Sequence, residues 1–415
     1  MTTNFRDVDP NLVVADDIFS PENIADPYAM FRRFRSRGPV VYSRRIDGWL
    51  VMGFDAVSAV LQDSASFSNR LSIWGRDMAE RLGQHSPLIA LDGDAHKRTR
   101  SITQRVFSPS ALAQQWEPRI REIVQEHVGQ IRAKERFRVV GDLAVPVPIR
   151  VIAEMLGLDH DAEKVREIKR LSDAVIDFLG HTNDDRFQAR EDAFMGSPQD
   201  SLYSYLFAEM TRKQESPGDD LISRMLSAEV EIDGVPQRLD AMEVFYFASL
   251  LLMAGNETTT HLIAQCLWYL ARHSDILGRI GVEKQLIPAT VEEVLRLEAP
   301  SQAFYREATC DTSVEGVPIR SGDPLLVSFA AAGRDPGQYE HPEEFRPDRR
   351  GVKHLAFGAG AHFCMGAGLA RLEACAVLEA VVDRFCEWAE PDGQVVTWRD
   401  TPLFRGPEEL ELVFR

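Results

Sequence analysis

Apolar residues recur at spacings of three and four along most of this 415-residue chain, which is typical of helices that bury one face. The longest such stretch, Leu239–His273, contains no proline and would form a helix of roughly 35 residues and about 50 Å, at 1.5 Å per residue. A helix of that length can cross a whole domain. Shorter helices are predicted over Pro109–Lys134, Asp161–Leu179, Asp200–Lys213, Pro288–Leu297 and Met365–Glu387.

Short runs rich in β-branched and aromatic residues predict a small amount of β-structure beside the helices. A turn at Ile46–Gly48 lies between the first two runs and Gly322 lies between the next two, so each pair is expected to form a hairpin. The predicted fold class is therefore mainly α with a small β part (α+β). The runs are Pro39–Ser43, Trp49–Gly53, Thr312–Val317, Leu325–Phe329 and Leu410–Phe414.

The chain shows no internal repeat and no low-complexity linker, so nothing in it marks a domain boundary. Its loosest stretch, Gly180–Gln199, is predicted to be a loop between helices. A length of 415 residues would allow two or three domains of about 150 residues each. The missing linker instead favours a single domain over residues 1–415.

Composition and charge exclude several classes of protein. The chain is 44% hydrophobic and 27% charged, as in ordinary globular proteins, and its net charge of −17 disfavours a nucleic-acid binder. The longest apolar run, Val244–Ala254, is shorter than the ~20 residues that span a bilayer, and the first residues do not resemble a signal peptide. Five cysteines suit a reducing compartment. We expect a cytoplasmic monomer with no membrane or nucleic-acid partner.

One cysteine lies in an unusual segment, His354–Arg371, which reads HLAFGAGAHFCMGAGLAR. A helical pattern follows Cys364, so the helix dipole and free backbone N–H groups would stabilise its thiolate. Gly358 and Gly360 allow a tight turn that can aim amides at the sulfur. A lone thiolate without a partner at zinc spacing is a poor zinc site but can be the single axial ligand of haem iron.

The alternative for such a cysteine is a small buried residue. We expect that simpler role for Cys375 and Cys386, which follow Cys364 at eleven-residue intervals and so share a helical stripe with it.

The pattern Phe357-Gly358-x-Gly360-x-His362-x-Cys364-x-Gly366 resembles the haem-binding signature of the cytochrome P450 superfamily, and all six fixed positions match. Chance would produce such a match on the order of once in a million chains of this length. The resemblance implies a soluble bacterial type of haem-thiolate monooxygenase, in which a long central helix lies over a haem held by the cysteine loop. Cys364 would be the iron ligand of a non-covalent haem b, and Phe357 and Gly366 would contact the cofactor.

A polar cluster, Ala254–Thr259, interrupts the apolar run of the predicted long helix. Buried polar groups cost several kcal/mol unless they are paired, so this cluster is either a solvated kink or a functional groove. Gly255 weakens the helix, and the Thr258 hydroxyl can donate to the Ala254 carbonyl and bend it. The cluster is similar to the P450 oxygen-activation motif, which implies that Ala254 and Gly255 lie against the haem. Thr258 would then bind dioxygen and a water, and Glu257 would relay protons from solvent.

Two further constellations match the family. Glu293 and Arg296 are three residues apart on one helix face and resemble its buried Glu-x-x-Arg pair, which has a structural role. The second arginine that usually joins this pair is absent at its usual place, where Glu344 stands, so Arg346 or Arg349 would substitute.

His96 and Arg100 face the same way at a spacing of four, which by itself fits a solvated basic face. By resemblance they would bind the two haem propionates, because carboxylates need cations and arginine offers bidentate geometry. Arg306 and His362 match a third and a fourth propionate ligand in the family.

No flavin or nicotinamide fingerprint is present, so electrons would come from a ferredoxin or flavodoxin and its NAD(P)H reductase. A basic rim on the cysteine side would steer an acidic partner, and charge reversal at Arg98 and Arg105 is expected to slow reduction. The rim residues are Lys97, Arg98, Arg105, Lys353 and Arg371.

The substrate pocket implied by family position is mostly apolar, with Ser301 and Gln302 as polar anchors, and fits a medium-sized lipophilic molecule. The leading function is hydroxylation or epoxidation of that molecule with O2. A peroxide-driven peroxygenase and a non-catalytic haem sensor are the alternatives, and a complete Glu257–Thr258 relay disfavours both. A helical interaction protein without haem is a further rival. The pocket segments are Ile73–Ala90, Ala174–His181, Phe247–Ala254, Ala299–Tyr305 and Leu403–Phe404.

Overall fold

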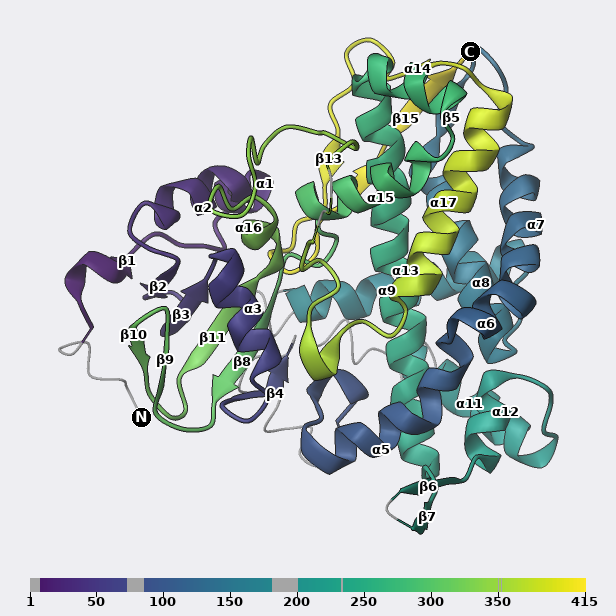
Figure 1. The fold of residues 1–415 in the computed structure, drawn as a ribbon. Coiled ribbons are helices and arrows are strands. Elements are labelled where there is room, and N and C mark those ends of the chain that lie inside the picture. Colours follow the sequence, from purple (N-terminus) through teal and green to yellow (C-terminus); the bar gives the residue numbers. More distant parts are fainter. Residues whose placement is uncertain (1–7, 73–85, 181–200, 233, 350, 352) are drawn as a thin grey trace.

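The computed structural model describes the chain except residues 1–7, 73–85, 181–200, 233, 350 and 352. The predicted loop Gly180–Gln199, except for Gly180, and residues 73–85 of the predicted pocket segment Ile73–Ala90 lie outside the described residues. A sheet-rich part lies on the left of Figure 1 and a helical part on the right, with the carboxyl terminus at the top of the helical part. This arrangement agrees with a mainly α fold that carries a small β part.

One helix, α13 (Ala241–Arg272), runs through the helical part and confirms the predicted long helix (Figure 1). Asp240 and Glu243 begin it with a capping box, in which each side chain accepts a hydrogen bond from the other residue's backbone N–H. It packs against α8 (Pro146–Leu156), α15 (Leu286–Leu297) and α17 (Ala367–Arg384). Its 32 residues therefore supply the central wall on which the other helices pack.

The remaining predicted helices are present with small changes at their ends. The segment predicted as Pro109–Lys134 contains α6 (Pro109–Ala111), a π-helical stretch Leu112–Trp116 and α7 (Glu117–Val128). The other helices are α1 (Pro21–Ala25), α2 (Pro27–Arg35), α3 (Phe54–Gln62), α5 (Gly93–Thr103), α9 (Ala162–Gly180), α11 (Leu202–Glu215), α12 (Leu221–Ser227), α14 (Ser274–Val282) and α16 (Phe329–Gly333).

The largest sheet has six strands in the order β1-β2-β3-β11-β8-β4. Its β2 and β3 form the predicted first hairpin, with Val40 opposite Val51. Next to this hairpin, β11 pairs with β3 in parallel orientation and with β8 in antiparallel orientation. The strands are β1 (Val13–Val14), β2 (Val40–Ser43), β3 (Gly48–Val51), β4 (Phe67–Ser72), β8 (Ala303–Ala308) and β11 (Pro324–Ser328).

The second predicted hairpin is wrong. β9 (Thr312–Val314) pairs with β10 (Val317–Ile319) and not with β11. The turn between them is Glu315–Gly316, where both residues have positive φ (49° and 76°), the geometry of a tight two-residue hairpin. Because a two-residue turn joins β9 to β10, these two strands pair with each other. β11 pairs instead with strands of the large sheet.

The last strand, β15 (Glu411–Phe414), confirms the predicted carboxyl-terminal strand and lies between β5 (Arg136–Arg138) and β12 (Trp388–Ala389). Two small hairpins complete the β-structure of the described residues. They are β6 (Val230–Ile232) with β7 (Val235–Gln237), and β13 (Thr397–Trp398) with β14 (Pro407–Glu409).

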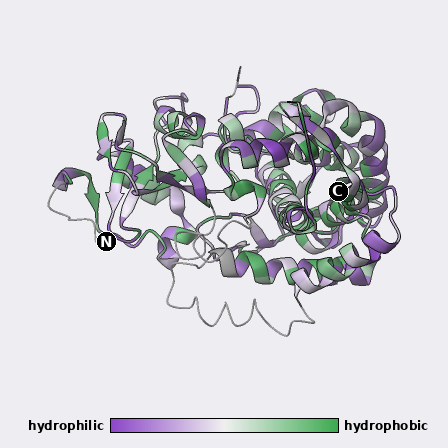
Figure 2. Cartoon of the chain, turned by 90° about the horizontal axis from the view of Figure 1, so that it is seen from below, coloured by the Kyte–Doolittle hydropathy of each residue, from purple (hydrophilic) through white to green (hydrophobic). Residues whose placement is uncertain are grey.

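The core consists of a large apolar cluster through the helices and a smaller one between the sheet and α3. Seen from below, apolar stretches occur on the helices and on the strands (Figure 2). Cys375 is half-buried, as a core position would allow, but Cys386 is exposed, so its predicted core role is wrong. The reason is that α17 ends at Arg384, before the helical stripe reaches Cys386. No helix among the described residues is long and apolar enough to cross a membrane.

Candidate active site

A cavity lies between α13 and the cysteine loop. Its volume is about 1650 Å³ when the solvent-filled space at its open mouth is included. Its lining is mainly apolar and includes side chains of α5, β8 and the start of α17. Cys364 lies on one wall, and the interrupted segment of α13 lies on another. The two motifs that are about a hundred residues apart in the sequence therefore face one space, as the sequence predicts.

The cysteine loop has the predicted tight geometry. Gly358 and Gly360 have φ of 70° and 67°, a region that favours glycine. A Cβ on Gly360 would come within 2.5 Å of the Leu61 carbonyl oxygen, because the loop is pressed against α3. The Cys364 N–H donates to the Phe357 carbonyl (2.9 Å), which closes the loop directly before α17.

The Cys364 side chain lines the cavity, inside the protein, and lies just before the first turn of α17. Burial raises the pKa of this thiol, and the backbone N–H of Gly366 and the charge of Arg100 only partly oppose the rise. A cation at the sulfur would remove the proton outright, as metal coordination does for thiols. The loop thus fixes the position of the sulfur, and a bound metal would ionise the thiol.

The opposite wall is formed by the part of α13 that the sequence marks as interrupted. Ala254, Gly255 and Thr258 are its accessible residues, and all three line the cavity. The Thr258 hydroxyl donates to the Ala254 carbonyl (2.8 Å), as predicted. A Cβ on Gly255 would lie 2.8 Å from Ile152, so this glycine lets α8 approach α13 closely.

Glu257 is 1% exposed, and two basic side chains and one histidine ring surround its carboxylate. Its carboxylate lies 3.2 Å from Lys169 Nζ, 3.2 Å from His261 Nε2 and 3.2 Å from Arg399 Nη1. Burial alone would raise the pKa of Glu257, but His261, Lys169 and Arg399 together lower it well below its usual range. Glu257 is therefore a buried, ionised carboxylate that directly precedes Thr258 in the sequence.

Of these three partners, only His261 could have been found from the sequence. It follows Glu257 by four residues and so lies on the same face of α13. Lys169 comes from α9 and Arg399 from the segment after β13, and no local pattern links either residue to Glu257.

The four predicted propionate ligands line the same side of the cavity. The rings of His96 and His362 lie 4.0 Å apart, and His96 Nε2 is buried without a hydrogen-bond partner among the described residues. Arg306 is 5% exposed and donates to the Tyr305 carbonyl (2.7 Å). Arg100 donates to the carbonyl of Phe363 (2.9 Å).

This group of donors is electrostatically incomplete. Burial, with His96 and Arg306 adding to it, lowers the pKa of His362 to about 2. Burial also lowers the pKa of Arg306 to about 10, and Asp92 is the one carboxylate that opposes this. A ligand with two carboxylates would supply the missing negative charge, so the residues present fit the propionates of a haem.

Glu293 and Arg296 form the predicted structural pair and are both fully buried. Arg296 binds the Glu293 carboxylate with two hydrogen bonds of 2.8 Å and also donates to the Gly333 carbonyl (2.7 Å). The third partner is Arg349, whose Nε donates to Glu293 (2.9 Å), whereas Arg346 contributes only its backbone N–H (2.9 Å). The substitution expected at the missing arginine is therefore confirmed, and Arg349 makes it.

The two predicted polar anchors, Ser301 and Gln302, line different cavities. Ser301 lines the large cavity, but Gln302 lines a smaller neighbouring pocket, and its amide donates to the Ala299 carbonyl (2.6 Å). Successive side chains of an extended segment point to opposite sides, so only one of the two can face the cavity.

The chain is similar to known proteins along most of its length. The family model described as Cytochrome P450 matches residues 27–414 of the chain. The chain belongs to the cytochrome P450 family. It is 34% identical over 400 residues to the cytochrome P450 monooxygenase PikC of Streptomyces venezuelae, which covers 94% of this chain and 92% of that protein. It is 33% identical over 387 residues to the cyclomarin C epoxidase CymV of Salinispora arenicola, which covers 92% and 95%.

Solved P450 structures share the fold. Cytochrome P450 CYP109Q5 from Chondromyces apiculatus has a TM-score of 0.81 and 33% identity, and the match covers 97% of this chain and 98% of that one. The family binds haem through a cysteine thiolate and uses O2 with electrons from redox partners. This P450 is therefore a haem-dependent monooxygenase.

Proposed function

We propose that this P450 hydroxylates or epoxidises a medium-sized lipophilic molecule, such as a steroid or a macrolide. The observation that carries the proposal is the mainly apolar cavity between Cys364 and Thr258. Relatives support it, since CymV is named as an epoxidase of cyclomarin C, and a P450 of Bacillus megaterium, CYP109E1, was solved with testosterone. That structure has a TM-score of 0.81 and 29% identity to this chain.

In the proposed mechanism Cys364 is the iron ligand, Ala254, Gly255, Phe357 and Gly366 contact the macrocycle, and four donors hold its propionates. Haem bound there supplies the activation of O2 with two electrons and two protons, so that RH becomes ROH and water is released. The propionate donors are His96, Arg100, Arg306 and His362.

The chain's own contribution to the chemistry is proton supply. Glu257 would relay protons from solvent toward the Thr258 hydroxyl, and Lys169 Nζ and His261 Nε2, both 3.2 Å from its carboxylate, are the neighbouring groups of this relay. Lys169 also lines an open groove at the surface and would link Glu257 to solvent through it. We further propose that the chain acts as a single-domain monomer over residues 1–415 in the cytoplasm.

A screen for the substrate tests the proposed class directly. A substrate that enters the cavity is expected to shift the ferric haem from low to high spin, and titration of a steroid and macrolide library measures this by absorption. A set of small charged metabolites is the control. Shifts produced by those metabolites and by no lipophilic compound would contradict the proposed class.

Replacing Thr258 by valine is expected to keep the haem spectrum but to divert most electrons to hydrogen peroxide, since valine keeps the shape of threonine and loses its hydroxyl. Peroxide formed per NADH consumed measures the effect. Thr260→Val is the matched control, because the Thr260 hydroxyl donates to the Ala144 carbonyl (2.9 Å) and not into the cavity. Tight coupling in Thr258→Val would reject the role assigned to Thr258.

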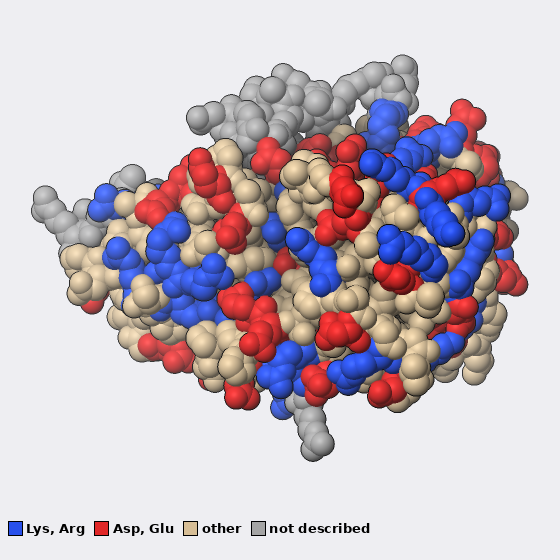
Figure 3. Space-filling view, turned by 90° about the horizontal axis from the view of Figure 1, so that it is seen from above, with Lys and Arg blue, Asp and Glu red and all other residues tan. Residues whose placement is uncertain are grey.

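We propose that an acidic ferredoxin or flavodoxin, reduced by its NAD(P)H reductase, binds the cysteine side of the molecule. Among the predicted rim residues, Arg98 and Arg371 are committed to ion pairs with Glu243 and Glu292. Arg105 and Lys353 are exposed and have no ion-pair partner among the described residues. Acidic and basic side chains are interspersed over the upper face (Figure 3), so the net charge of −17 does not rule out local basic sites.

Charge reversal at Arg105 is expected to slow reduction by a ferredoxin about tenfold at low salt, and the effect should fade as salt screens it. Stopped-flow reduction at two ionic strengths measures this, with Arg98→Glu as a second variant. Arg132→Glu, at an exposed arginine after α7, is the control. Equal rates in Arg105→Glu and Arg132→Glu would reject the proposed docking side.

A further inference from the structure

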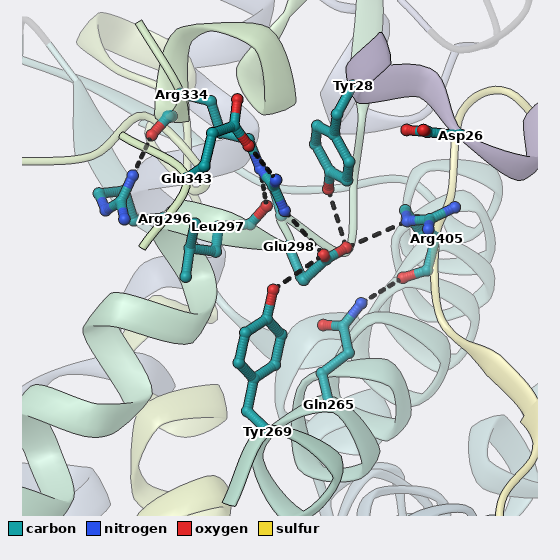
Figure 4. A network of polar contacts seen from close by, with 12 residues as sticks. Asp26, Tyr28, Gln265, Tyr269, Arg296, Leu297, Glu298, Arg334, Glu343 and Arg405 are labelled. Atoms are coloured by element: carbon teal, nitrogen blue, oxygen red, sulfur yellow. Dashed lines mark hydrogen bonds and ion pairs between the residues drawn. The ribbon is translucent and has the colours of Figure 1, made fainter. Parts of the chain in front are cut away.

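A second buried carboxylate, Glu298, collects four donors outside the haem cavity (Figure 4). Tyr28 and Tyr269 donate their hydroxyls to it at 2.8 and 3.0 Å. Arg334 Nη2 and Arg405 Nε donate at 2.8 and 3.0 Å. The residue is 4% exposed, so both of its oxygens are fully engaged inside the protein.

The four donors come from distant parts of the chain. Tyr28 belongs to α2, Tyr269 to α13, Arg334 follows α16, and Arg405 lies between β13 and β14. A buried charge is costly unless every partner is in place, and a fully satisfied buried network is rigid. Glu298 therefore joins four segments in one fixed arrangement.

Arg405 is the member that leads back to the active site, because it fixes the loop Arg399–Gly406. Its backbone N–H donates to the Pro300 carbonyl (2.8 Å), and its own carbonyl accepts from Gln265 Nε2 (2.9 Å). Its guanidinium lies 4.1 Å from the centre of the Trp398 ring while it binds Glu298. The loop is thus held from both its backbone and its side chain.

Three residues of this loop contact the active-site groups. Phe404 is 5% exposed and lines the haem cavity. Arg399 binds Glu257 at 3.2 Å. Gly406 lies so close to His261 that a Cβ on it would be 2.1 Å from the ring, and His261 is itself a partner of Glu257. The loop therefore sets one wall of the cavity and the surroundings of the carboxylate that we propose as proton relay.

We propose that Glu298 is a positioning residue of the monooxygenase reaction: through Arg405 it fixes the loop Arg399–Gly406, and so places Phe404 at the substrate and Arg399 and His261 at Glu257. The proposal rests on the proposed role of Glu257 for its second part only, because the placement of Phe404 is a matter of cavity shape.

The test compares Glu298→Gln with the wild-type holoenzyme by two readouts. Titration with 4-phenylimidazole, which must fit against the cavity wall, is expected to show an affinity about tenfold weaker, while that of imidazole changes less than about twofold, because displaced walls penalise the larger ligand. Peroxide formed per NADH consumed, with a ferredoxin as donor, is expected to rise about threefold, because Glu257 loses its fixed partners.

Asp220→Asn is the matched control, because it opens another buried ion pair, Lys213–Asp220 (2.8 Å), whose partner lies on α11. Loss of thermal stability in both variants with a change of ligand affinity only in Glu298→Gln supports the proposal. If both variants bind 4-phenylimidazole as the wild type does, Glu298 is merely structural and the proposal fails.

A milder variant covers the case in which Glu298→Gln does not fold. Tyr269→Phe removes one donor and leaves both arginines on the carboxylate, so a smaller shift of 4-phenylimidazole affinity in the same direction is expected. An unchanged affinity in Tyr269→Phe together with Tyr28→Phe overturns the proposal. If the affinity for 4-phenylimidazole changes but the peroxide yield does not, the part of the proposal that concerns Glu257 is wrong, and the part that concerns Phe404 stands.

Discussion

Replacing Cys364 by alanine is expected to abolish the thiolate band in the carbon monoxide difference spectrum of the reduced protein, and all monooxygenase activity with it. Among the described residues that line the cavity, Cys364 is the only cysteine, so no other thiolate can take its place. A thiolate ligand pushes electron density toward O–O cleavage, and a neutral ligand cannot do this. Difference spectroscopy, with haem content measured separately, checks the result.

Cys375→Ala is the matched control, since Cys375 lies on α17, the helix that follows Cys364, and does not line the cavity. It should keep the full thiolate band and wild-type activity. A thiolate band that persists in Cys364→Ala would show that a different residue holds the iron, and the assignment of the whole cysteine loop would then be wrong.

The parts of the site that could be predicted from the sequence are those set by a short segment. The glycines around Cys364 fix the loop by their own conformation, and the Thr258 hydroxyl reaches a carbonyl four residues before it. The long helix was equally clear, because its apolar pattern and its missing proline are local properties. In each case neighbours in the sequence determine the geometry.

The rest depends on contacts between distant segments. The buried charge of Glu257 is balanced by Lys169 and Arg399, and that of Glu298 by Arg334 and Arg405. Neither set has a recognisable spacing. The mistaken hairpin has the same origin, since β11 is drawn into the large sheet by β3 and β8. Ionised groups that need several partners are placed by the completed fold and not by local pattern.

The buried pair behind the haem site leads to the second large effect, in Glu293→Gln. Glutamine keeps the size of glutamate and removes its charge, so the fully buried Arg296 and the nearly buried Arg349 lose their counterion. Breaking a buried pair on one side costs about 3–5 kcal/mol, a large share of the stability of an ordinary domain. We expect a protein that is recovered mostly without haem, because Arg296 also ties α15 to the last residue of α16 through the Gly333 carbonyl.

Urea unfolding and the ratio of haem to protein measure the effect of Glu293→Gln. Glu117→Gln is the matched control, because it removes the same charge from an exposed pair with Arg121, which contributes less than about 1 kcal/mol. The glutamine amide can still accept one hydrogen bond from Arg296, so the loss in Glu293→Gln comes mainly from the unpaired positive charges. A second substitution, Arg349→Leu, would remove one of those charges and should restore part of the lost stability. If Glu293→Gln were no less stable than Glu117→Gln, the buried charges would have to be balanced by another group, and Glu293 would not be the residue that holds this side of the fold together.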